Sequence, residues 1–238
     1  MPVAFTPIQS LYTRQQIHEA TRLSLDVVGY WIKESLLRAK EAEGQGRGKH
    51  RRFGFEALHI AGILAEIHRY GVGLAGLRQI AKLLWASAGI PVVFPGITER
   101  AVLDSRTLIS ARAAHPLKGT LSRGDEGVCY FEDWLEERQN SRIAIDPMAF
   151  ELESRMSPEL YSIMALYFDL FSERSFTSTN SRLYVVRLES DDIALLPSNI
   201  PESEGVENFP SYLSVNASRI IRDIWGLDAG RTAPQPIK

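Results

Sequence analysis

The sequence predicts an α+β protein whose two parts differ in pattern and in charge. Residues 1–85 repeat apolar side chains at helical spacing, whereas RLYVVRLE at 182–189 has the length and composition of a strand. Residues 1–85 also hold 12 of the 27 Lys and Arg and 7 of the 29 Asp and Glu, a balance of +5, which leaves −7 for 86–238. We therefore expect a basic, mostly helical domain at 1–85, a linker at 86–97, and an acidic mixed α and β domain at 98–238.

Two short helices are expected near the start of the chain. Thr13 is an N-cap candidate and has Gln16 three residues on, which is the spacing of a capping box. Ser24 is a second N-cap candidate, and Asp26 lies in the turn behind it, where negative charge suits the helix dipole. These signals predict helices that begin just after residues 13 and 24.

The second of these helices has one apolar face and one polar face. Its apolar residues recur at one-turn spacing and are Val27, Val28, Trp31 and Ile32. The remaining face carries Asp26, Gly29, Tyr30 and Lys33. A face with a phenol, a cation and a small residue can lie close against a nucleic-acid groove, but the same periodicity is typical of an ordinary helical hairpin.

The segment that follows, residues 38–52, is rich in Lys and Arg. Residues 38–52 contain Arg38, Lys40, Arg47, Lys49, Arg51 and Arg52, lack bulky apolar side chains, and have three glycines that permit sharp turns. Its second half is almost purely basic, which suits contact with a phosphate backbone. Two helices joined by a tight turn and followed by a basic hairpin are the layout of a winged helix-turn-helix with a small β wing, a module that reads DNA.

Several short motifs follow one another in a characteristic order within the first 85 residues. They are Tyr12-Thr13, Ala20-Thr21, Leu23-Ser24, Tyr30-Trp31, Glu34, Leu36-Leu37 and Gly48-Lys49-His50-Arg51-Arg52-Phe53. In this order and spacing they resemble the N-terminal domain of MerR-type transcription regulators. The resemblance implies a four-helix winged domain whose second helix enters the major groove. It also marks the expected DNA contacts, which are Thr13, Arg14, Tyr30, Lys33, Arg38, Lys49, His50, Arg51 and Arg52.

A few positions depart from the pattern of that family. Gly29 stands where the family usually has an arginine that binds phosphate. Arg22 and Ser35 stand where glycines are usual, and Ile32 replaces a common glutamate. These departures bear on how the module would bind DNA more than on its fold.

Two further helices are expected at 55–70 and 74–85, with Gly71 as the C-cap of the first. His59 and His68 are nine residues apart, which is not the i, i+4 spacing of two metal ligands on one helix face. We therefore interpret both histidines as ordinary surface or boundary residues.

The second half of the chain predicts a mixture of elements. The segment AGIPVVFPG, at the expected linker, surrounds Val92-Val93-Phe94 with two prolines and two glycines, so it is either a short strand or a linker that docks. Strands are expected at 128–131, 142–145, 182–189, 193–196 and 212–215, the third and fourth as a hairpin. Helices are expected at 98–114, 132–138, 217–225 and from Ser157-Pro158-Glu159 onward.

No catalytic pattern is evident in that half. His115 is its one histidine and Cys129 the one cysteine of the chain, and a carboxylate cluster at 132–137 is typical of a solvated helix face. There is no glycine-rich phosphate loop either, so we expect no cofactor, no metal site and no enzyme activity. Five aromatic residues, Tyr161, Tyr167, Phe168, Phe171 and Phe176, could line a pocket for a small apolar effector, although a plain core or a dimer surface explains them as well.

These patterns predict a sequence-specific transcription regulator that binds double-stranded DNA. Its other expected partners are a second copy of the chain, RNA polymerase and a small apolar effector. An excisionase-like or partition-type DNA architecture protein is the main alternative, and an enzyme with its site in the second half is a weaker one. One cysteine excludes an internal disulfide, no apolar run reaches the roughly 20 residues that span a bilayer, and the first ten residues do not resemble a signal peptide. We therefore expect a cytoplasmic protein without a membrane partner.

Overall fold

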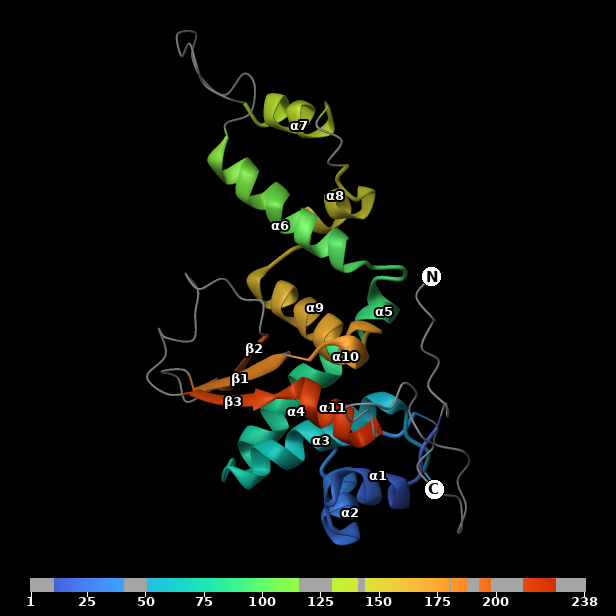
Figure 1. Cartoon of the computed structure of the whole chain (residues 1–238). Helices are drawn as coiled ribbons and strands as arrows, with labels where there is room; N and C mark the ends of the chain where they lie inside the picture. Colours follow the sequence, from blue (N-terminus) through green and yellow to red (C-terminus); the bar gives the residue numbers. More distant parts are fainter. Residues whose placement is uncertain are drawn as a thin grey trace. The chain divides into compact units, whose positions relative to one another are not determined.

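The described residues form helices and one small sheet (Figure 1). The computed structural model describes residues 11–40, 51–115, 130–140, 144–179, 181–187, 193–197 and 212–225. Its three strands form an antiparallel sheet, which confirms the α+β class. The chain divides into two compact units: unit 1 comprises residues 1–90 and 165–238, and unit 2 comprises residues 91–164.

Unit 1 begins with two short helices, α1 (Arg14–Thr21) and α2 (Leu25–Lys33). Both predicted N-caps are confirmed. The Thr13 hydroxyl accepts a hydrogen bond from the Gln16 N–H at 3.2 Å, and the Gln16 side chain accepts one from the Thr13 N–H at 2.9 Å. The Ser24 hydroxyl accepts from the Val27 N–H at 3.2 Å. The chain turns between the helices through Arg22, whose φ of 58° is left-handed.

The centre of unit 1 is α3 (Phe55–Arg69), and α4 (Leu74–Ala88) follows it as expected. Ten of the fifteen residues of α3 are buried, so apolar side chains cover more than one of its faces. It packs against α1, α4 and the last helix, α11 (Ala217–Trp225), which Figure 1 shows lying across it. Gly62 allows this close approach, because a Cβ there would lie 2.6 Å from Cδ1 of Ile224.

The sheet of unit 1 has the strand order β2-β1-β3. Its strands are β1 (Arg182–Arg187), β2 (Ile193–Pro197) and β3 (Tyr212–Asn216), which confirms the predictions of strands in these three places and of a hairpin between the first two. Val185 of the central strand lies opposite Leu195 on one side and Leu213 on the other. This row belongs to the same hydrophobic core as α3.

The structure divides the chain differently from the expected domains. Residues from Ala165 onward belong with the first ninety residues, whereas one domain was expected at 98–238. The physical reason is the burial of α3: Ile221, Ile224 and Trp225 of α11 complete the core around it. Two helices lead into this part, α9 (Pro158–Leu170), which was expected, and the single turn α10 (Arg174–Thr177).

Unit 2 is helical in its described residues. It contains α6 (Glu99–Ala114), α7 (Phe131–Asn140) and α8 (Pro147–Glu153), around a small core of Leu108, Ala111, Phe131 and Ala149. Two strand expectations need correction, and so does the strand alternative for residues 92–94. The segment at 92–94 overlaps the short helix α5 (Ile90–Val93), Phe131 begins α7, and 144–145 has no regular structure. Residues 128–129 and 142–143 lie outside the described residues.

Candidate nucleic-acid interface

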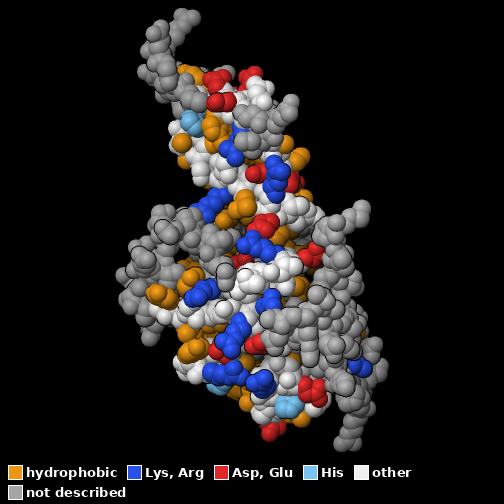
Figure 2. All heavy atoms as spheres, in the orientation of Figure 1, with side chains coloured by type: hydrophobic (Ala, Val, Ile, Leu, Met, Phe, Trp, Pro, Cys, Tyr) orange, Lys and Arg blue, Asp and Glu red, His pale blue; other side chains and the backbone are white. Residues whose placement is uncertain are grey.

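Four of the nine predicted DNA contacts line one surface hollow of unit 1. They are Thr13, Arg14, Lys33 and Arg51, and the hollow measures about 960 Å³. Its walls come from the start of α1, from the side of α2 and from the residues just before α3, with Gly29 and Ile32 between the cations. We call this feature the cationic hollow. On the face shown in Figure 2, by contrast, Lys and Arg side chains (blue) are spread among other groups without forming one continuous patch.

Main-chain pairing brings Arg51 to this place. Tyr12 and Phe53 form an antiparallel bridge, with the Tyr12 N–H donating to the Phe53 carbonyl at 2.7 Å and the Phe53 N–H donating to the Tyr12 carbonyl at 2.9 Å. The Lys40 N–H donates to the Arg52 carbonyl at 2.9 Å. Lys40 and Arg52 therefore lie side by side near the start of α1, and Arg51 lies next to this pairing.

Arg14 is fixed by the main chain at the start of α2. Its Nε donates to the Leu25 carbonyl at 3.1 Å, and its Nη2 donates to the same oxygen. The guanidinium lies directly over Gly29, where a Cβ would come within 2.9 Å of Nη2. The side chain is exposed and remains open to a ligand in the hollow.

Within the described part of the chain, the cations that line the hollow have no carboxylate partner. Among the described residues, no ion pair involves Arg14, Lys33 or Arg51. Glu34, which directly follows Lys33, forms an ion pair with Arg78 of α4 instead. Asp26 is exposed in the first turn of α2 and does not line the hollow.

Three other predicted contacts are described and lie outside the hollow. Tyr30 is 47% exposed on α2 but is not part of the hollow. The guanidinium of Arg38 lies 5.4 Å from the ring centre of Trp85, and Arg52 is half-buried. Lys49 and His50 lie outside the described residues.

His59 is a correction to the sequence interpretation, because it is fully buried within α3 rather than at a boundary. Trp225 Nε1 donates to His59 Nε2 at 2.7 Å, so the ring proton is on Nδ1, which donates to the Leu170 carbonyl at 2.6 Å. Burial lowers the pKa of His59 to about 4, although the carbonyl partly opposes this shift. The neutral imidazole thus ties α3 to α9 and α11. His68 is exposed, as expected.

Two of the five aromatic residues considered for an effector pocket pack around this histidine. The ring of Phe171 stacks on His59 at 6.0 Å between centres, and Phe176 lies 5.5 Å from it. Phe171 is part of the core of unit 1, and Phe176 packs against that core. For these two residues the structure supports the plain-core alternative.

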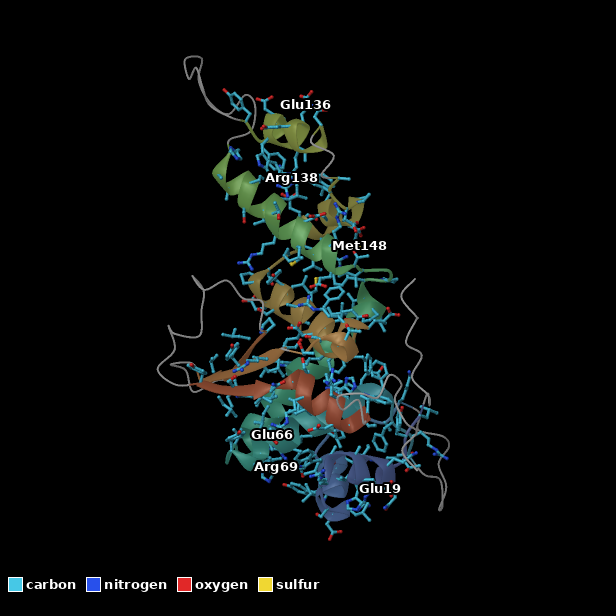
Figure 3. The ribbon with its side chains drawn as sticks, viewed as in Figure 1. Glu19, Glu66, Arg69, Glu136, Arg138 and Met148 are labelled. Atoms are coloured by element: carbon cyan, nitrogen blue, oxygen red, sulfur yellow. The ribbon has the colours of Figure 1, made fainter. Side chains whose placement is uncertain are left out.

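A second hollow of unit 1 is charged but balanced. It measures about 350 Å³, and its lining includes Asp223 of α11 together with Glu19 of α1 and Glu66 and Arg69 of α3. Figure 3 labels the last three of these side chains. Arg69 and Glu66 form an ion pair at 2.7 Å, so opposite charges face each other at this site. In the described part of the chain, no group of three or more His, Cys, Asp or Glu side chains could hold a metal ion.

Comparison with known proteins adds no assignment to this geometry. No protein-family model matches the chain, and no curated protein matches its sequence. Within the described ranges, no helix has both the length and the apolar character needed to cross a membrane. The function must therefore be inferred from the residues of this chain.

Proposed function

We propose that the protein binds double-stranded DNA through the cationic hollow and the exposed face of α2, and that it regulates transcription at the bound site. The observation that carries this proposal is the hollow itself. Arg14, Lys33 and Arg51 come from three separate segments, line one concave surface, and have no carboxylate partner among the described residues. A DNA backbone supplies closely spaced negative charges that such a surface can neutralise.

The local geometry also supports the resemblance to a winged helix-turn-helix. Two capped helices are followed by a segment whose ends are paired beside the start of α1. Arg22 and Ser35 have φ values of 58° and 60°, and they are the only non-glycine residues with positive φ in the described ranges. These are the two positions at which the MerR-type pattern usually has glycine, the residue that adopts this conformation without strain.

In the proposed complex α2 lies in the major groove. Tyr30 and Lys33 of its outward face contact base edges, while Arg14 and Arg51 hold backbone phosphates and fix the register. Two copies of the chain bind the two halves of an inverted repeat. RNA polymerase is the partner whose activity at that site is regulated. A small apolar effector would act on this assembly.

Fluorescence anisotropy with a labelled duplex tests the proposal on the full chain. If about three phosphates are neutralised per chain, affinity should fall by roughly 40-fold between 50 and 200 mM salt. Arg51→Ala should weaken binding to all duplexes alike, whereas Tyr30→Ala or Lys33→Ala should also change sequence preference. Lys82→Ala is the matched control, because Lys82 is an exposed cation of α4 outside the hollow. Affinity that does not change with salt would refute the proposal.

A further inference from the structure

Arg14 is an exposed cation that is held by a neutral group. Two N–H donors on Nε and Nη2 are directed at the Leu25 carbonyl. A guanidinium has five such donors, so three remain for another acceptor. Because a carbonyl oxygen carries no net charge, Arg14 is oriented without losing its positive charge, unlike Arg78, which is paired with Glu34.

The position of this guanidinium depends on Gly29. A Cβ at residue 29 would lie 2.9 Å from Nη2, 3.0 Å from Cζ and 3.2 Å from Nη1 of Arg14. Such distances are tighter than nearly all contacts that real Cβ atoms make, so the flexible end of the Arg14 side chain would have to shift. Any side chain at position 29 would therefore push the guanidinium away from its place over α2.

Glycine at this position has a cost for the helix. Gly29 is the fifth of the nine residues of α2, and glycine in a helix interior is destabilising by about 0.5–1 kcal/mol relative to alanine. The backbone of Gly29 is helical, so no positive φ requires glycine there. Because glycine has no side chain, position 29 leaves free the space that the Arg14 guanidinium occupies.

Gly29 lines the same hollow as the cations Lys33 and Arg51. Lys33 follows it by four residues, so the two lie one turn apart on the same face of α2. Arg51 lines the same hollow from the opposite segment. The guanidinium over Gly29 thus supplies a third cation to a surface that already has two.

We infer that Gly29 is a positioning residue that holds Arg14 in the cationic hollow, beside Lys33 and Arg51, where Arg14 binds a phosphate of the DNA backbone. This inference rests on the proposed function and adds a role for Gly29, which is to leave room for the Arg14 guanidinium. It also explains how α2 presents a guanidinium to DNA although α2 itself contains no arginine.

The test compares Gly29→Ala with Arg14→Gln in the salt titration described above. Both variants should reduce the slope of log affinity against log salt by about one, because each removes one phosphate contact. The double variant should bind no more weakly than Arg14→Gln alone, because the two changes remove the same contact. Gly73→Ala is the matched control, since a Cβ at Gly73 meets nothing within 4 Å.

Thermal unfolding of the same variants separates binding from folding. Gly29→Ala should be at least as stable as the original chain, because alanine favours the helix. If Arg14→Gln lowers the slope and Gly29→Ala does not, Arg14 binds phosphate without needing Gly29, and the inference is overturned. If neither variant changes the slope, Arg14 only ties α1 to α2, and the inference is also overturned. Absence of salt-dependent binding by the original chain would instead refute the proposed function.

Discussion

His59 leads to a prediction about stability and pH that can be worked out from the structure. Its side chain is fully buried, with Nε2 accepting from Trp225 and Nδ1 donating to the Leu170 carbonyl. A second ring proton would have to sit on Nε2, where it would face the Trp225 N–H. Burial is the main cause that lowers the pKa of His59 to about 4, from 6.5 for an exposed histidine.

The direction of the effect follows from proton binding. Between pH 6.5 and 4 the unfolded chain binds a proton at His59 and the folded chain does not, so acidification through this window favours unfolding. Over the whole range between the two pKa values, the difference corresponds to a loss of about 3 kcal/mol in the free energy of unfolding. About 2 kcal/mol of this should be lost between pH 7.5 and pH 5. Above about pH 7.5 the contribution of this residue should be constant.

Urea unfolding at a series of pH values measures this loss. His59→Gln is the matched variant, because an amide has both a donor and an acceptor but does not titrate in this range. The other histidines and the carboxylates contribute equally to both proteins, so their effects cancel in the difference. The stability advantage of the original chain over His59→Gln should therefore shrink by about 2 kcal/mol from pH 7.5 to pH 5. A difference that stays constant over this range would refute the burial of a neutral His59 between α3 and α11.

Four other substitutions test the local structure and the DNA surface. Replacing either Arg22 or Ser35 with glycine should raise the free energy of unfolding by about 1 kcal/mol, because both have left-handed φ values, and a urea titration with alanine variants as controls would show it. Thr13→Ala should lower thermal stability by about 1 kcal/mol through loss of the capping box; unchanged unfolding would mean that this cap does not form. Asp26→Asn should strengthen duplex binding by a few-fold, measured by anisotropy at low salt, because Asp26 is an exposed carboxylate on the outward face of α2. Equal affinity would show that this end of α2 does not approach the backbone.

The sequence predicted some residues of the candidate site but not their arrangement. Arg14, Lys33 and Arg51 were all predicted as contacts from the order of motifs, and the structure brings them to one hollow. Tyr30 and Arg38, predicted in the same way, lie outside it. The sequence contained no signal for the place of Arg14 over Gly29, because that contact depends on the angle at which α1 meets α2.

The compact units differ from the expected domains for a related reason. Composition and charge change near residue 86, and that change was interpreted as a boundary. Burial follows a different division, since α11 and the sheet pack with α3 in unit 1. A charge balance reports on solvent-exposed side chains, whereas a domain is defined by the apolar side chains that it buries.

The sequence by itself determined the local features of this protein. The caps at Thr13 and Ser24, the strand at β1 and the final helix follow from hydrogen bonds and side-chain spacing within a few residues. Only the tertiary structure decided that α11 covers α3, that His59 is buried between them, and that three distant cations share one hollow. Those features depend on contacts between residues far apart in the chain, and neither periodicity nor local propensity specifies which surfaces will meet.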